Sequence, residues 1–384
     1  MKIFCKKNII IFFICHVCII IIFQKKNQMY DHRTLQYILI RVFQYGVRSE
    51  SFYNERENQM DLMGPQNEDE PPPLDGVGDT LFTRARNLER TLGFGNIFLK
   101  FEGGNPTGTQ KDRISQYHVK KALREGYDTI TVGTCGNYGV SLAYFAKLAG
   151  LKAKILIPEQ YYVSPKRKEE LQSFNAEILT IDGKYEDAVE ESRKLSRMEH
   201  IYDANPGNGN EGWRGYMSIA YEIYRQLGRS PTAVAAPVGN GTTLVGIYHG
   251  FKNLFDKNII DRMPYLVGAS TPGGNPIIKS FKAGASKTED LQPAEIKESS
   301  INEPLIAYHS YDGDDALHAI YETNGWADYA SDSCMLKFHT LLKDLEGLNV
   351  LPASASPIEA LIKFKEHRVL NSDYVIVLTG RKFR

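Results

Sequence analysis

The sequence predicts an α/β protein of two domains, each with a mostly parallel, twisted sheet flanked by helices. From about residue 75 onward, short apolar runs typical of buried strands alternate with segments whose apolar residues recur at helical spacing. Such alternation is typical of parallel sheets connected by helical crossovers. The chain of 384 residues is also long enough for two domains of ordinary size.

The composition indicates a globular protein without the strongly positive electrostatic field that attracts nucleic acid. Hydrophobic residues make up 42% and charged residues 24% of the chain, and the formal net charge is zero. The charge is unevenly distributed. Residues 1–50 hold eight basic and two acidic residues, which leaves 38 basic and 44 acidic residues beyond them, a net charge of −6. We therefore expect no nucleic-acid partner.

The first 28 residues form an apolar and basic N-terminal segment. Its apolar run, 9–23, is shorter than the roughly 20 residues of a membrane-spanning helix and has the length of a signal-peptide core, but no small-residue cleavage site follows. Three interpretations stay open: upstream sequence outside the protein, with the start at Met29 or Met60; a retained membrane anchor; or a cleaved signal. We expect a cytoplasmic protein, or a membrane-anchored one if 9–23 are translated and retained.

Residues 29–74 are polar, end near a run of three prolines, and predict a partly disordered linker. Two further patterns could suggest metal but favour other roles. Cys15 and Cys18 have C-x-x-C spacing without a second ligand pair, and the five cysteines of the chain show no disulfide framework. Asp312, Asp314 and Asp315 lack EF-hand spacing and precede an apolar helical pattern, so they predict a helix N-terminus. We expect no metal site.

The regular elements follow from apolar periodicity and from stop signals such as Gly150, which follows a helical pattern. Strands are expected at 97–101, 129–132, 153–158, 177–181, 232–237, 265–269 and 374–378. Helices are expected at 140–149, 165–174, 185–198, 216–227 and 244–255.

Four polar or glycine-rich loops follow strands of this set. Ligands of open α/β sheets bind at the carboxyl ends of strands, so these loops are candidates for one site. The first loop, 102–111, ends in Lys111; the others are 133–139, 238–243 and the pair Thr379 and Gly380.

The chemistry of these loops points to a phosphate, a carboxylate and an amine. Residues 238–243 are small and precede a helix, which suits a phosphate, but they match neither a Walker loop nor the G-x-G-x-x-G fingerprint. Residues 134–138 could hold a carboxylate by the same physics. Together with Lys111, this is what pyridoxal phosphate and an amino acid require. Taken singly, the loops could equally be an ordinary turn, a helix cap and a solvated lysine.

A resemblance adds to this interpretation. Residues 78–88, 105–113 (NPTGTQKDR), 134–138, 237–243, 352–355 and 378–380 resemble, in order, motifs of the fold-type II pyridoxal-phosphate enzymes, the tryptophan synthase beta-like superfamily. Within this family they resemble threonine synthases most. The resemblance covers roughly residues 75–384, and the lysine motif is its most specific part.

The resemblance implies a role for each matching residue. Lys111 would form the Schiff base with the cofactor and later move protons. Asn137 would bind the cofactor's ring hydroxyl, and Thr379 would meet its pyridine nitrogen, where a hydroxyl fits elimination or replacement chemistry. The cofactor phosphate would be held by Gly239, Asn240, Gly241, Thr242 and Thr243. The substrate would be bound by Thr134, Cys135, Gly136, Asn137 and Tyr138.

The resemblance also implies an architecture and an activity. A smaller substrate-side domain would span 113–205, a larger cofactor domain 75–112 plus 206–384, and the cofactor would lie in the cleft between them; a homodimer would be usual for the family. The expected enzyme is a carbon–oxygen lyase that converts O-phosphohomoserine and water to threonine and phosphate. The alternatives are cysteate or cysteine synthase, threonine or serine dehydratase, and a non-catalytic protein that binds an amino acid or the cofactor.

Three positions depart from the threonine synthase pattern and put the substrate in doubt. The arginine usual shortly after Asn205 and Pro206 is absent, and Asn208 stands near its place; Arg214 is an alternative source of the charge. Tyr138 replaces a small hydroxyl residue, and Leu351 replaces an acid. Cys135 is expected to be a small filler rather than a nucleophile.

Overall fold

The computed structural model describes residues 2–6, 9–14, 17–22, 74, 76–134, 136–159, 165–207, 209–368 and 373–382. The chain divides into two compact units, 1–70 and 71–384. In the first unit β1 (Lys2–Lys6), β2 (Ile9–Ile14) and β3 (Val17–Ile22) pair antiparallel in that order. Within the described parts of the chain, no helix has both the length and the apolar character needed to cross a membrane. The predicted linker, except Leu74, lies outside the described residues.

The second unit contains a six-stranded sheet in the order β12-β11-β10-β13-β5-β4. All neighbouring strands pair parallel except β4, which pairs antiparallel with β5 at one edge. The central strands β10 and β13 are buried at every residue, as their apolar sequences AVAAP and YVIVL require. The six strands are β4 (Leu81–Arg84), β5 (Ile97–Phe101), β10 (Ala233–Pro237), β11 (Tyr265–Ser270), β12 (Trp326–Tyr329) and β13 (Tyr374–Leu378).

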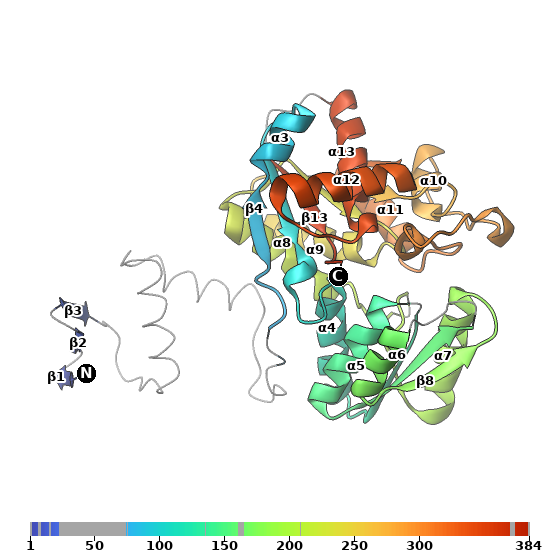
Figure 1. Cartoon of the computed structure of the whole chain (residues 1–384), viewed down its shortest axis with the longest axis horizontal. Helices are drawn as coiled ribbons and strands as arrows, with labels where there is room; N and C mark the ends of the chain where they lie inside the picture. The colour runs from blue at the N-terminus through green and yellow to red at the C-terminus, as the bar shows by residue number, and fades with distance from the viewer. Residues whose placement is uncertain are drawn as a thin grey trace. The chain divides into compact units, whose positions relative to one another are not determined.

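A second sheet has four parallel strands in the order β8-β7-β6-β9. These strands are β6 (Thr129–Gly133), β7 (Lys152–Pro158), β8 (Glu177–Ile181) and β9 (Tyr202–Asp203). Its chain segment also contains α4 (Lys111–Arg124), α5 (Asn137–Ala149), α6 (Pro165–Ser173) and α7 (Tyr185–Glu199). Figure 1 shows α5, α6, α7 and β8 gathered in one part of this unit and α3, α12, α13 and β4 in another. The second unit is therefore α/β with two sheets, and all strands of the smaller sheet fall within 113–205.

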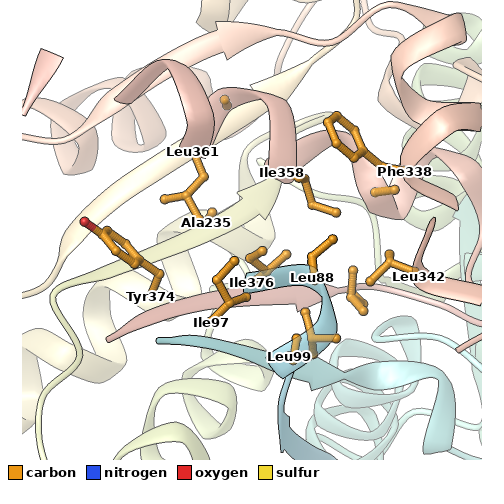
Figure 2. Packing of buried hydrophobic residues seen from close by; sticks show 14 of the residues in the cluster. Leu88, Ile97, Leu99, Ala235, Phe338, Leu342, Ile358, Leu361, Tyr374 and Ile376 are labelled. Carbon is orange, nitrogen blue, oxygen red and sulfur yellow. The ribbon is translucent and has the colours of Figure 1, made fainter. Parts of the chain in front are cut away.

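The core of the larger sheet explains how its helices are held. Figure 2 shows Phe338 and Leu342 of α12 (Asp332–Glu346) and Ile358 of α13 (Ser356–His367) packed over the strands β5 and β13. Each such side chain contributes roughly 1.5–3 kcal/mol when fully buried. The other elements of this part are α3 (Arg86–Leu92), α8 (Arg214–Leu227), α9 (Thr242–Asp256), α10 (Pro276–Lys282), α11 (Gly313–Glu322), η1 (Glu102–Gly104), η2 (Pro293–Glu295), η3 (Glu303–Leu305) and η4 (Pro352–Ala355).

The bounds of the predicted elements lie within three residues of those in the structure. All seven expected strands and all five expected helices are present. The helix start at Asp312 is confirmed, but the carboxylate of Asp312 accepts a hydrogen bond from the Thr242 hydroxyl instead of capping α11. The predicted elements did not include the strands β4, β9 and β12 or the helices α3, α4, α10, α12 and α13, and α4 begins at Lys111 itself.

Candidate active site

Loops from both sheets line one cavity of about 320 Å³. The residues predicted for the site are brought together there, except Cys135, which lies outside the described residues. The part of the chain that carries the smaller sheet contributes Thr134, Gly136, Asn137, Tyr138, Lys184, Tyr185 and Glu186. The larger sheet's loops contribute Gln110, Lys111, Pro237, Gly239, Asn240, Gly241, Thr242, Thr243, Leu351, Ala353, Ser354, Thr379 and much of the segment 293–308.

Lys111 is the first residue of α4, and it lines this cavity. Among the described residues no hydrogen bond or ion pair engages its Nζ, which lies 5.4 Å from the centroid of the Tyr138 ring. Burial lowers the pKa of Lys111 to about 8, although the negative charge of Asp312 acts in the opposite direction. Such an amine is readily deprotonated near neutral pH, so it can act as a nucleophile or as a base.

The two residues after Lys111 anchor the start of α4. The Asp112 carboxylate accepts hydrogen bonds from the Thr107 amide at 2.7 Å and from the Ser141 hydroxyl of α5 at 2.6 Å. The Arg113 guanidinium donates to the carboxylates of Glu102 and Glu222. Both anchors are buried, and breaking a buried ion pair from one side costs roughly 3–5 kcal/mol. The position of the lysine is therefore fixed from both parts of the unit.

The loop between β10 and α9 is built as an anion cradle. The N–H groups of the first turn of α9 have no partner within the helix and carry the positive end of its dipole. Gly241 has φ +91°, and a Cβ there would lie 2.8 Å from the Ala316 Cβ. The Asn275 amide supports the loop by donating to the carbonyls of Val238 at 3.2 Å and Gly239 at 2.9 Å. Only glycine fits at position 241, and without a side chain there the backbone N–H groups remain accessible to a phosphate.

Asp312 lies against the same cradle through its bond to Thr242. Burial raises the pKa of Asp312 to about 6, against a hydrogen bond from Thr242 that lowers it. The amide of Asp312 also donates to the Asn240 carbonyl at 3.1 Å. Asp312 therefore contacts the cradle through Thr242, and its negative charge also raises the pKa of Lys111.

A pair of hydroxyl groups closes another side of the cavity. Thr379, directly after β13, shares a 2.8 Å hydrogen bond with Ser354 of η4, and the Gly380 amide donates to Ser354 at 3.0 Å. Both side chains are neutral hydroxyls, so no carboxylate stands there. Sequence reasoning noted the motif 352–355 but gave Ser354 no role, although its place in that motif was the available signal.

Tyr138 connects the predicted substrate loop to the segment after β9. Its ring is only 7% exposed, and its hydroxyl donates to the Ala204 carbonyl at 2.7 Å. The tyrosine therefore fills the space beside Lys111 and holds the residue before Asn205. Asn208, which stands near the place of the missing arginine, lies outside the described residues.

The structure does not place Arg214 at the cavity. Its guanidinium pairs with Glu211 at 2.8 Å, lies over the Trp213 ring, and is 46% exposed. The charged side chains that do line the described cavity wall, besides Lys111, are Lys184, Glu186, Glu298 and Glu303. Lys184 and the three glutamates were not predicted from the sequence, because no motif connects them to the loops after the strands.

The residues present fit pyridoxal phosphate. The cradle without side chains at Gly239 and Gly241 suits its phosphate, and Lys111 is an unpaired amine within the described cavity. No group of three or more His, Cys, Asp or Glu side chains suited to a metal occurs among the described residues.

Comparisons with known proteins agree with this geometry. A family profile described as pyridoxal-phosphate dependent enzyme matches residues 73–380. Threonine synthase of Methanocaldococcus jannaschii is 32% identical over 301 residues, which are 78% of this chain and 73% of the relative. Threonine synthase of Methanosarcina acetivorans is 32% identical over 313 residues, 81% of this chain and 75% of the relative.

Solved structures share the fold. Threonine deaminase isoform 2 of Solanum lycopersicum has a TM-score of 0.68 at 16% identity and covers 87% of this chain and 91% of its own. Maize serine racemase has a TM-score of 0.67 at 18% identity, with 79% of this chain and 88% of its own covered.

Proposed function

The chain belongs to the family of pyridoxal-phosphate-dependent enzymes, and from this premise we propose that it converts O-phosphohomoserine and water to threonine and phosphate. Its cofactor is pyridoxal phosphate. The observation that carries the proposal is Lys111, an unpaired amine among the described residues, facing the same cavity as the glycine cradle at 239–243. The names of the most similar curated relatives support the choice of reaction.

In this proposal the chain's own residues bind the cofactor, orient the substrate and transfer protons. The backbone amides of 239–243 would hold the cofactor phosphate at the start of α9. Lys111 would hold the cofactor, and its free amine would accept a proton from the substrate Cα and return protons later. When bound, the cofactor supplies an electron sink that stabilises negative charge on the substrate.

The remaining side chains orient the reacting groups. Thr134, Gly136, Asn137 and Tyr138 line the side of the cavity where the substrate carboxylate would bind, at the start of α5. Thr379, which shares a hydrogen bond with Ser354, would offer its hydroxyl to the ring nitrogen of the cofactor. A hydroxyl does not stabilise a protonated ring as a carboxylate would, and this suits elimination and replacement chemistry.

The decisive test compares Lys111→Ala with Lys120→Ala, a lysine of the same helix that does not line the cavity. The protein is purified with pyridoxal phosphate and given O-phosphohomoserine, and both phosphate and threonine are measured. We expect Lys111→Ala to lose activity by at least about 1,000-fold and to lose the borohydride-reducible cofactor linkage in mass spectra. Lys120→Ala should keep both. Retained activity and linkage in Lys111→Ala would refute the proposal.

A second candidate function is favoured by the absence of the expected arginine. The acidic side chains in the cavity wall, Glu186, Glu298 and Glu303, could suit an amino acid without a phosphate. Phosphoserine, acetylserine, serine and threonine are therefore assayed in parallel, with acetate and ketoacid as products. Turnover of one of these and not of O-phosphohomoserine would assign a cysteate or cysteine synthase or a dehydratase. Cofactor binding without turnover of any substrate would indicate the non-catalytic alternative.

The domain bounds 113–205 and 75–112 plus 206–384 remain part of the proposal, as do the homodimer and the cytoplasmic location. The separate sheets support the bounds, because no strand of one sheet lies within the other's segment among the described strands of 71–384. Sedimentation of the purified protein would test the dimer, and cell fractionation would test the location.

A further inference from the structure

The proposed reaction needs a cation that the sequence leaves unassigned. A phosphate monoester carries close to two negative charges at neutral pH, and buried or half-buried anions require a charged or hydrogen-bonding partner. Arg214 is paired with Glu211 outside the cavity. Among the described residues that line the cavity, the cations are Lys111 and Lys184. Because the proposed function assigns Lys111 to the cofactor, Lys184 is the cation left for a substrate phosphate among the described cavity residues.

Lys184 directly precedes α7, and it is half-buried in the cavity wall. Its Nζ donates one hydrogen bond, at 3.3 Å, to the carbonyl of Pro293, which lines the same cavity. No carboxylate within the described parts of the chain forms an ion pair with it. The positive charge of Lys184 is thus not neutralised by a described neighbour.

The nearest acids in the chain are engaged elsewhere. The Glu186 carboxylate accepts the amide of Tyr308 at 3.0 Å and that of His309 at 3.5 Å. The Asp187 carboxylate accepts the backbone amide of Lys184 at 2.7 Å, not its ammonium group. These bonds fix the start of α7 against the segment 293–308. They leave the ammonium of Lys184 with the three donors of a lysine and one known acceptor.

We propose that Lys184 binds the phosphate group of the substrate and thereby takes the part of the missing arginine as a specificity-determining residue. This inference rests on the proposed function. Lysine is a compact, strongly charged phosphate ligand, and its flexible stem lets it follow the group. When the Cγ–O bond breaks, its electron pair leaves with the phosphate, and the ammonium of Lys184 in the cavity wall would stabilise that charge. Water supplies the hydroxyl of threonine.

The test uses the holoenzyme and three variants. Lys184→Met removes the charge, and Lys184→Arg keeps it. Lys147→Met is the matched control, because Lys147 also belongs to the smaller sheet's segment, also donates to a single backbone carbonyl, that of Ser173, and does not line the cavity. Binding of inorganic phosphate is measured by calorimetry, and KM and kcat are measured for O-phosphohomoserine.

We expect Lys184→Met to weaken phosphate binding and to raise KM by about 10- to 100-fold, the effect of one charge-assisted hydrogen bond. Lys184→Arg should stay within a few-fold of the natural protein, and Lys147→Met should match it. The absorption of the bound cofactor should be the same in all four proteins, which shows that the site is intact.

The outcomes separate this inference from the proposed function. Unchanged phosphate binding and KM in Lys184→Met, with O-phosphohomoserine still turned over, would overturn the inference and leave the function standing. Lys184-dependent phosphate binding without any turnover would refute the function and support an anion subsite at Lys184. A natural protein whose cavity binds no phosphate at all would overturn the inference directly.

Discussion

At the scale of single residues, the protonation state of Lys111 determines how fast the cofactor associates with the protein. Attack on an aldehyde requires the neutral amine, and burial lowers the pKa of Lys111 to about 8. The rate of cofactor association with the cofactor-free protein should therefore rise about tenfold per pH unit below 8 and level off above it. Stopped-flow absorbance between pH 6 and 9.5 would measure this profile.

Asp312 provides the internal comparison for that profile. Its negative charge raises the pKa of Lys111, so Asp312→Asn should move the midpoint to lower pH. Asp314→Asn is the control, because its carboxylate binds Thr288. Ionisation of the free cofactor affects the pH profiles of all variants equally, so it does not contribute to the difference between them. A midpoint that does not move in Asp312→Asn would contradict the coupling between these two groups.

Sequence reasoning named the residues that belong to local patterns, and the structure brings them to one cavity. Lys111 and the cradle at 239–243 belong to contiguous motifs, so a role could be assigned without a fold, and these roles stay predictions. Lys184 and Ser354 could not be assigned in this way, because their neighbours at the cavity come from distant parts of the chain: Pro293 for Lys184 and Thr379 for Ser354. The effect of Tyr138 on the segment after β9 likewise depends on a contact across 66 positions.

At the scale of elements, the close packing of α8 against α9 sets the position of the phosphate cradle. A Cβ at Gly246 of α9 would lie 2.4 Å from the Trp213 carbonyl and 2.5 Å from the Tyr216 Cβ. In an isolated helix, alanine would be favoured over glycine by about 1 kcal/mol. Here the overlap with backbone costs more, because overpacking of this kind typically costs about 1–3 kcal/mol.

Gly246→Ala should therefore destabilise the protein by about 1–2 kcal/mol and weaken cofactor binding, since α9 must shift with its first turn. The urea midpoint and the dissociation constant of the cofactor would measure both effects. Gly104→Ala serves as the control, because its Cβ would meet nothing nearer than 3.9 Å. A Gly246→Ala protein as stable as the Gly104→Ala protein would contradict this account.

Strands with a continuous apolar sequence were predicted, and short strands defined by their neighbours were missed. The strand β13 (YVIVL) was predicted from its continuous apolar sequence, and α7 was predicted because its apolar residues recur at helical spacing. The edge strand β4 (LFTR) is short and partly exposed, so its pairing with β5 decides its conformation. The strand β12 (WADY) contains an aspartate and likewise depends on its partner, β11.

For the whole molecule, one buried charge network controls how stability responds to acid. Lys100 and Arg113 both pair with Glu222. Burial raises the pKa of Glu222, but attraction to Arg113 and Lys100 outweighs this and lowers it to about 2. A carboxyl group whose pKa is lowered by folding stabilises the protein above its unfolded value of 4.5, and this stability is lost as the pH falls from there toward 2.

Glu222→Gln should remove that acid-dependent part of the stability and also destabilise the protein at pH 7 by roughly 3–5 kcal/mol, because two buried cations lose a counter-charge. Urea midpoints at pH 7, 4 and 3 would show both effects. Glu211→Gln breaks only the exposed pair with Arg214 and should cost less than about 1 kcal/mol. Equal losses in the two variants would show that the network contributes no more than a surface pair.

The pairing of β13 with β5 joins Tyr374 to Ile97, whereas the four-stranded sheet is complete at Asp203. During synthesis the smaller sheet can therefore assemble while the ribosome is still producing the rest of the chain. The larger sheet cannot, because its central strand β13 is synthesised after every other strand of that sheet, and long-range parallel pairing is slow. Until β13 has been synthesised, the apolar strands β5 and β10 lack their shared neighbour, and we expect chaperones to bind these segments of the nascent chain.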